Sequence, residues 1–312
     1  MPGAFRSSFG GLMRILTCAA MAATGMAPAL ATAGTAAVKL TVKAETVDIT
    51  IGGEEFATYH FAKTLPKPFL LPVKAPGGVT VTRSLDKPED HPHHKGIWCS
   101  IDEVNDIKFW AEKGKIENVS VKAEVAEGNP AKLAVVNHWL GTDGKPVLIE
   151  TTTISIHANR LLSYDMKFTA DEMPVKFGDT KEGMFGIRLV NSLREKETGK
   201  VQNAEGLKGT KECWGKHSAW VDYYGEVDGK TVGVTVMDDP KNFRKSRYHV
   251  RDYGLFTISP FGDKSYTNGK EPEFPFELKP GAKFSLRYGI YLHTGDTEQG
   301  KVANAYQQFL KG

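Results

Sequence analysis

The chain has 312 residues, of which 40% are hydrophobic and 25% are charged, and its formal net charge is +3. This length suits one large domain or two ordinary ones. The sequence has no run rich in lysine and arginine. Nucleic acid is therefore not an expected partner, because nucleic-acid binding needs a clustered basic surface.

The first residues have the features of a secretory signal peptide. Arg6 and Arg14 precede an apolar run at 15–30, and Ala29 and Ala31 fit a small-residue cleavage site. The run is short and rich in small residues, which favours a cleaved signal over a membrane anchor. We expect residues 1–33 to be removed and the protein to be periplasmic or secreted, with no stable membrane span.

Two cysteines, Cys99 and Cys213, remain after such a cleavage. An exported chain can form a disulfide bond, but two cysteines do not make a disulfide scaffold. One bridge and two separate thiols are equally compatible with the sequence.

The rest of the chain predicts β-structure. Apolar and polar residues alternate at 47–51, 119–125 and 284–292, and β-branched and aromatic residues are frequent at 147–156 and 161–168. Turn residues separate these runs, and Asp228-Gly229 is typical of a hairpin. We expect an all-β fold, a large antiparallel β-sandwich formed by 34–312 as a single domain.

Only the end of the chain predicts a helix. Val302, Ala305, Tyr306 and Phe309 fall at helical spacing, which indicates a C-terminal helix packed on a sheet. The polar, Gly- and Pro-rich stretch 262–275 is expected to be a long loop.

A histidine cluster is the strongest chemical signal. His91, His93 and His94 fall within four residues, and imidazole is the side chain best suited to proton transfer or metal binding near neutral pH. In an extended segment His91 and His93 would face one side and His94 the other. The cluster is consistent with a chelating pair, with a proton donor beside a binding residue, or with histidines bonded to loop carbonyls.

Acidic and aromatic residues follow this cluster. If a strand continues from His94, then His94, Trp98 and Asp102 share a face. A ring and a carboxylate on one surface suit a sugar, although a solvated acidic loop with core tryptophans would have the same sequence.

Three later segments add candidates. Glu182 precedes a glycine and a strand that carries Arg188, an arrangement consistent with a carboxylate–guanidinium pair. Trp214 is flanked by Gly215 and polar residues and is a better candidate for a pocket than for the core. In the segment 248–254, His249 and Arg251 share one face and Asp252 takes the other.

Five motifs together give a family resemblance. They are His-Pro-His-His-Lys-Gly-Ile-Trp (91–98), Lys-Glu-Gly (181–183), Trp-Val-Asp-Tyr (220–223), His-Val-Arg-Asp-Tyr-Gly-Leu-Phe (249–256) and Tyr-Leu-His-Thr-Gly (291–295). With these motifs the chain resembles a bacterial family of unknown function that is often labelled "methane oxygenase PmoA-like". The resemblance implies an exported β-sandwich protein tied to sugar catabolism. One departure is that Cys99-Ser100-Ile101 replaces the usual aromatic–Ala–His continuation.

Our first hypothesis is a carbohydrate-active enzyme on a galactose-mutarotase-like supersandwich, catalysing hydrolysis, elimination or epimerisation. His93 or His94 would donate a proton, and Glu182 or Asp102 would act as the base. The substrate, a small molecule or an oligosaccharide, would be bound by His91, Trp98, Arg188, Trp214, His249, Arg251 and Asp252.

Two alternatives come from other classes. One is a hydrolase or oxygenase that uses a divalent metal held by His91, His93 and His249. The other is a non-catalytic glycan-binding protein that depends on Trp98 and Trp214. The fold does not decide between them, because sandwiches host all three functions. The sequence leaves the oligomeric state open.

Overall fold

The computed structural model describes residues 1, 3–5, 8, 10, 37–86, 88 and 90–312. The chain divides into two units, Met1–Gly34 and Thr35–Gly312. The expected signal peptide, 1–33, lies outside the described residues except at 1, 3–5, 8 and 10. All the helices and strands below belong to the second unit.

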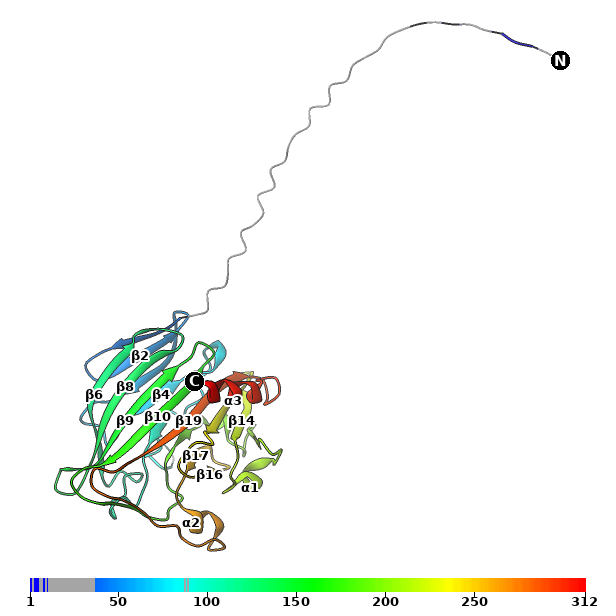
Figure 1. Ribbon diagram of the computed structural model, residues 1–312. Coiled ribbons are helices and arrows are strands. Elements are labelled where there is room, and N and C mark those ends of the chain that lie inside the picture. The colour runs from blue at the N-terminus through cyan, green and yellow to red at the C-terminus, as the bar shows by residue number, and fades with distance from the viewer. Residues whose placement is uncertain (2, 6–7, 9, 11–36, 87, 89) are drawn as a thin grey trace. The chain divides into compact units, whose positions relative to one another are not determined.

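The second unit contains two large antiparallel sheets, which confirms the expected all-β sandwich (Figure 1). The first sheet contains β1 (Val38–Val42), β2 (Thr46–Ile51), β3 (Glu54–His60), β4 (Phe69–Val73), β5 (Ile97–Cys99), β7 (Glu127–Gly128), β12 (Phe185–Arg188), β16 (Arg247–Val250) and β17 (Leu255–Ser259). Their order is β16-β17-β12-β5-β4-β3-β2-β1-β7.

The second sheet supplies the other half of the core. It contains β6 (Lys115–Val125), β8 (Ala131–Leu140), β9 (Pro146–Ile156), β10 (Leu161–Ala170), β13 (Lys200–Asn203), β14 (Trp220–Val227), β15 (Lys230–Asp238) and β19 (Lys283–Thr294), in the order β13-β14-β15-β19-β10-β9-β8-β6. The strands β11 (Val175–Phe177) and β18 (Phe276–Leu278) form a separate small sheet. Buried residues of both large sheets form one continuous hydrophobic cluster.

The expected C-terminal helix is α3 (Val302–Lys311), which lies along β19 in Figure 1. Its buried residues Val302 and Phe309 pack against Leu161 and Met237. Two helices of five residues each, α1 (Gly209–Cys213) and α2 (Asp263–Thr267), were not expected, and α2 interrupts the predicted loop 262–275. Two short 3-10 turns, η1 (Pro76–Gly78) and η2 (Asn191–Leu193), complete the helical elements of the described chain.

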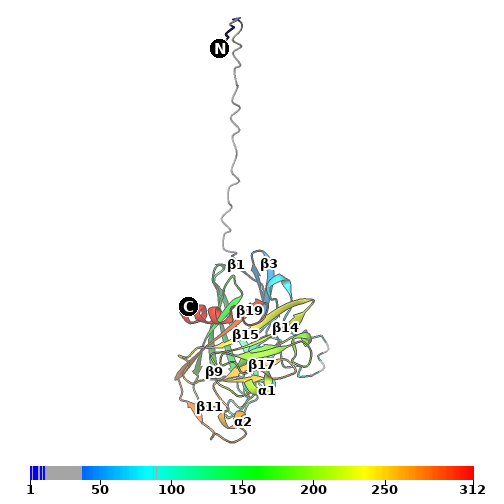
Figure 2. The ribbon, with the colours of Figure 1, turned by 90° about the vertical axis from the view of Figure 1, so that its right-hand side faces the viewer.

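Figure 2 shows α1 and α2 on the same end of the unit as β17. No helix within the described ranges is both long enough and apolar enough to cross a bilayer.

Cys99 and Cys213 are both free thiols, so the open question of a bridge is answered by two separate cysteines.

Periodicity predicted most strands correctly but was only partly right in β6, where Val121 and Ala123 pack against the core as expected. In β19 the five expected apolar residues, Phe284, Leu286, Tyr288, Ile290 and Leu292, are all buried. In β6, by contrast, Val119 and Val125 are exposed. The ladder with β8 shifts register between Asn118 and Ser120. Such a bulge moves the following side chains to the opposite face.

The hairpin between β14 and β15 closes as predicted. Asp228 and Gly229 occupy its turn with φ of 49° and 72°, the left-handed values that a type I′ turn requires. The hairpin places Asp222 of β14 beside Thr235 of β15.

A buried histidine–aspartate pair ties three strands of the second sheet together. His293 in β19 donates from Nε2 to Asp222 in β14 at 3.0 Å and from Nδ1 to the Thr294 carbonyl at 3.2 Å. The hydroxyls of Thr235 and Thr297 donate to the same carboxylate at 2.8 and 2.7 Å. Burial alone would lower the pKa of His293, but its hydrogen bond and charge interaction with Asp222 outweigh burial and raise it. Since both ring nitrogens face acceptors, the ring is held as imidazolium.

Two glycines make room for this ring. A Cβ at Gly233 would lie 2.3 Å from His293, and one at Gly300 would lie 2.1 Å from it. No larger residue fits at either position without moving the imidazole.

Replacing Asp222 with Asn should destabilise the fold by about 3–5 kcal/mol, because it leaves a buried cation without its partner. The raised pKa of His293 sets the pH dependence of this contribution. It is complete below about pH 6.5, the ordinary histidine value, and is lost as pH rises through the higher native pKa. Urea denaturation across this range measures both effects.

The control is Asp228→Asn at the exposed hairpin turn, where Asn tolerates left-handed backbone. We expect it to change stability by less than about 0.5 kcal/mol. An Asp222→Asn protein with wild-type stability and the wild-type pH slope would contradict the ion pair.

Candidate functional site

The candidate site lies where β5, β12 and β17 are neighbours in the first sheet. Arg188 at the end of β12 pairs with Leu255 of β17, and Ile187 pairs with Ile97 of β5. The motif-bearing segments 90–96, 180–184 and 249–254 adjoin these strands and β16. The strand order therefore brings together motifs that are far apart in the sequence.

The histidine cluster forms a turn rather than the expected extended segment. The amide of His94 donates to the His91 carbonyl at 3.0 Å, and His91 has a left-handed φ of 41°. The expected separation of His91 and His93 from His94 is wrong, because all three rings contact one another. Their centroids lie 4.7 Å (His91–His94), 4.5 Å (His93–His94) and 5.7 Å (His91–His93) apart.

The rings continue as a stack through the site. Tyr253, His91, His94 and Trp98 follow one another with interplanar angles of 2°, 5° and 18°. His91 is exposed, whereas His94 and Trp98 are only 1% and 2% exposed. The expected roles of His94 as proton donor and Trp98 as sugar platform are therefore corrected, since neither ring is accessible to a substrate in this structure.

Arg188 anchors the turn to β12. Its guanidinium, on a residue that is 1% exposed, donates to His94 Nδ1 at 3.1 Å and to the Asp90 carboxylate at 2.7 Å. Because a guanidinium can only donate, Nδ1 of His94 accepts and its proton is on Nε2. Burial, and then the charges of its neighbours, lowers the pKa of His94 far below the ordinary value.

The expected pair between Glu182 and Arg188 does not form, and Asp90 takes the place of Glu182. Glu182 precedes β12 and Arg188 ends it, so the two residues lie at opposite ends of an extended strand. Burial works to raise the pKa of Asp90, but hydrogen bonds from Arg188 and Arg83 outweigh it and hold that pKa below its usual range.

Glu182 is half-buried, and its carboxylate makes no hydrogen bond or ion pair with any described residue. Burial raises the pKa of this carboxyl. The Lys181 charge opposes that rise, Asp102 adds to it, and Arg251 and His91 oppose it more weakly. A partner-free carboxyl with a raised pKa, beside cations, is typical of an acid–base group.

Asp102 lies behind Glu182. β5 ends at Cys99, so Asp102 follows the strand instead of sharing a face with His94 as expected. Its backbone amide donates to the Glu182 carbonyl at 3.0 Å, and its carboxylate accepts from the Ala111 amide at 3.1 Å. The residue is 7% exposed, and burial raises the pKa of its carboxyl.

His249 is attached to the loop that carries Glu182. Its Nδ1 donates to the Lys181 carbonyl at 2.8 Å, so the neutral ring keeps a lone pair on Nε2. Burial lowers the pKa of His249 to about 3. The ring of Trp214 lies edge-on to it at 4.6 Å.

An open cavity of about 490 Å³ is lined partly by Lys181, Trp214 and Arg251, and its lining includes neither His249 nor Glu182. The Arg251 guanidinium lies 5.1 Å from the Trp214 ring and 5.5 Å from the Tyr253 ring. Asp252 also lines this cavity, where it pairs with Lys196 at 3.4 Å.

His93 is half-buried at the other end of the cluster. Burial, together with the charge of Lys67, lowers its pKa to about 4. Lys67 is itself 1% exposed, donates to the His93 carbonyl at 2.9 Å and pairs with Glu112 at 2.9 Å. Burial lowers the pKa of Lys67 to about 8.

The residues expected to hold a metal are not arranged as ligands. Within the part of the chain that the structure describes, no three His, Cys, Asp or Glu side chains form a group that could hold a metal ion. His91 and His93 pack ring to ring, and His249 is bonded through Nδ1 to a backbone carbonyl.

Sequence reasoning missed four residues that build this region: Lys67, Arg83, Asp90 and Tyr253. Asp90 directly precedes the histidine cluster, and Tyr253 directly follows the Arg251-Asp252 pair, so proximity to a motif was an available signal for both. Arg83 and Lys67 stand among ordinary loop residues and offered no such signal.

Residues 46–307 match the profile of a family described as "Family of unknown function (DUF6807)". The chain belongs to this family. The match confirms that the chain belongs to a family of unknown function, while the methane oxygenase label and the five motifs stay a prediction. No curated protein matches the sequence.

Solved structures with a similar fold include three sugar-epimerase-like proteins. A galactose 1-epimerase from Lactobacillus acidophilus NCFM has 10% identity and a TM-score of 0.43, with 83% of this chain and 98% of that chain covered. A galactose mutarotase-like protein from Clostridium acetobutylicum has 12% identity and a TM-score of 0.46, with the same coverage. A putative aldose 1-epimerase from Klebsiella pneumoniae has 11% identity and a TM-score of 0.45, with 88% and 86% covered.

The geometry predicts that the imidazoles of His93, His94 and His249 are uncharged at neutral pH. Ring ¹⁵N spectra at pH 7 should show His93, His94 and His249 as neutral rings, with the proton on Nδ1 in His249 and on Nε2 in His94. Because the pKa values of His93 and His249 are lowered to about 4 and about 3, neither should titrate between pH 5 and 8. A His249→Gln variant assigns that resonance, and a His249 midpoint near 6.5 would contradict the arrangement.

Proposed function

We propose that this protein is an exported enzyme that acts on a sugar or glycoside by proton transfer at Glu182. The proposal rests on one observation, the half-buried Glu182 carboxyl, which has a raised pKa and no partner among the described residues. Most other buried charges of this region are paired, as in Arg188–Asp90 and Lys67–Glu112. Leaving one carboxyl free in such surroundings favours a chemical role.

The neighbouring residues support recognition of a sugar. The half-buried Trp214 ring offers a flat apolar face for the C–H face of a pyranose. Arg251, over that ring, offers hydrogen-bond donors to hydroxyl or developing oxyanion groups. His249 is 2% exposed, so its expected contact with the substrate is corrected: the ring holds the Lys181 carbonyl and supports the loop that carries Glu182.

One carboxyl favours epimerisation or elimination over hydrolysis. Glycoside hydrolysis generally needs two carboxyl groups that flank the scissile bond. Asp102, the other carboxyl near Glu182, is buried and accepts from the Ala111 amide. We therefore assign the proton transfer to Glu182 and place Asp102 behind it, where its charge helps to raise the pKa of Glu182.

Replacing Glu182 with Gln should lower kcat by about 10²–10⁴-fold, the range for loss of a general acid or base. Stability should hardly change, because the carboxylate makes no bond that Gln would lose. Proton NMR of a panel of neutral and acidic mono- and oligosaccharides detects epimerised, cleaved or unsaturated products in one experiment.

The matched control is Glu172→Gln, an exposed glutamate between β10 and β11. It should retain wild-type turnover. Wild-type turnover in Glu182→Gln would reject the assignment. Sugar binding without any product from the wild-type protein would favour the glycan-binding alternative.

If Glu182 acts as the base, kcat/KM should rise with pH as this carboxyl loses its proton. The midpoint should lie above the ordinary glutamate value of about 4.3, because burial raises the pKa. Replacing Arg251 with Gln removes a charge that lowers this pKa, so the midpoint should move to higher pH. If kcat/KM instead fell as pH rises over this range, the active form of Glu182 would be the protonated one.

A further inference from the structure

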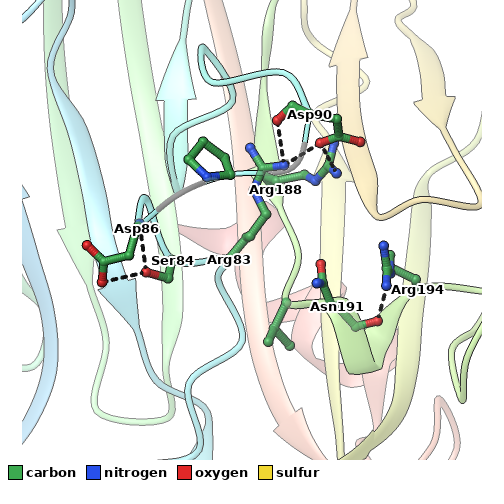
Figure 3. A pocket seen from close by; sticks show the side chains of 9 residues that line it. Arg83, Ser84, Asp86, Asp90, Arg188, Asn191 and Arg194 are labelled. Atoms are coloured by element: carbon green, nitrogen blue, oxygen red, sulfur yellow. Dashed lines mark hydrogen bonds and ion pairs between the residues drawn. The ribbon is translucent and has the colours of Figure 1, made fainter.

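A second cavity lies beside Arg188, at the end of β12. Its volume is about 350 Å³, within the range of small-molecule sites. Its lining includes Arg83, Ser84, Asp86, Asp90, Arg188 and Arg194. Figure 3 shows Arg83 and Arg188 turned toward Asp90, with Asn191 and Arg194 on a neighbouring wall.

The buried charges of this cavity are not balanced. Arg83 and Arg188 are 7% and 1% exposed, and both bond to the single carboxylate of Asp90. Their remaining bonds go to neutral acceptors, namely backbone carbonyls and His94 Nδ1. Among the described residues, two buried cations share one carboxylate, and one positive charge has no counter-charge there. This is costly unless an anion completes the site.

The hydrogen bonds of the arginines also indicate a site for an anion. Nε of Arg83 and Nε of Arg188 are buried and have no hydrogen-bond partner among the described residues. Arg194 adds a third guanidinium to the wall, which pairs with Glu197 at 3.5 Å. Asp86, the other acid of the wall, bonds to Ser84 and makes no ion pair with these arginines among the described contacts. In the described part of the wall, the buried Nε groups of Arg83 and Arg188 therefore remain donors without an acceptor.

The cavity is linked to the Glu182 region through one aromatic ring. The guanidinium of Arg188 lies 4.8 Å from the Tyr253 ring, and that of Arg251 lies 5.5 Å from the same ring. Glu182 and Arg188 both act on the pKa of Tyr253. Since Glu182 and Arg188 are at opposite ends of β12, a ligand that reaches both regions must be longer than one sugar unit.

We propose that this cavity binds the anionic group of an acidic oligosaccharide, a carboxylate or a sulfate ester, while another unit of the same chain reaches Glu182. The inference rests on the proposed function and narrows its substrate from sugars in general to acidic glycans. Guanidinium groups bind carboxylate and sulfate through paired hydrogen bonds, which neutral sugars cannot form with the same strength.

The test compares dissociation constants of trigalacturonate, a sulfated trisaccharide and neutral galactotriose, measured by NMR titration at constant ionic strength. At least one acidic trisaccharide should bind about tenfold tighter than the neutral one, as expected for a charge-assisted hydrogen bond. The carboxylated and sulfated arms identify which anionic group is preferred. Binding of inorganic sulfate without preference for either acidic sugar would overturn the proposal.

The informative variant is Arg194→Gln, because Arg194 lines the cavity but its side chain is 21% exposed and is not part of the Asp90 pair. It should remove most of the acidic preference. Arg188 is a poor choice, since its loss leaves Asp90 and His94 without their partner and threatens folding. Lys230→Gln, a charge-matched change at an exposed lysine bonded to the Gly77 carbonyl, should keep the preference. An unchanged preference in Arg194→Gln would overturn the proposal.

The Glu182→Gln protein separates the two proposals. It should retain the acidic preference, because Glu182 does not line the cavity. If this variant keeps wild-type turnover but the preference depends on Arg194, the catalytic assignment fails and the anion site stands. If turnover is lost while acidic and neutral trisaccharides bind equally, the anion site fails and the catalytic assignment stands.

Discussion

The buried Arg188 guanidinium is the interaction on which the candidate site depends. A cation at this depth is tolerated only with a partner and satisfied donors. Asp90 supplies the charge and His94 an acceptor, so the turn that carries the histidines is fixed to the end of β12. The turn that carries the histidines places His91 against Tyr253. This contact joins the turn to the corner between β16 and β17.

Near this anchor, burial shifts the pKa values of histidines and carboxyls in opposite directions. The imidazoles of His93 and His249 are buried enough to stay neutral, with pKa values of about 4 and about 3. The carboxyls of Glu182 and Asp102 have raised pKa values for the same reason. The same region thus contains neutral imidazoles and carboxyls that keep their protons to a higher pH than usual. This combination suits the proposed proton transfer at Glu182, because no histidine of the region has to become charged first.

Sequence periodicity predicted the fold because its strands bury one face, as β19 does over its whole length. It was wrong at Val119 and Val125 of β6, because the register shifts of this strand cannot be seen in the alternation of its residues. The histidine cluster was located by composition, but its geometry was missed, since Pro92 is also the residue preferred at the second position of a β-turn. The sequence could not show that Asp90 is the partner of Arg188, because the two residues are 98 positions apart along the chain.

The position of β12 between β5 and β17 has a consequence for how the protein is made. Residues near 90, 182 and 250 meet only after strands from three distant parts of the chain have paired. Contacts of such long sequence separation form slowly. A nascent chain that has not yet supplied β17 therefore cannot hold the ring stack or the Arg188 anchor, so the candidate site forms only after β17 has been synthesised.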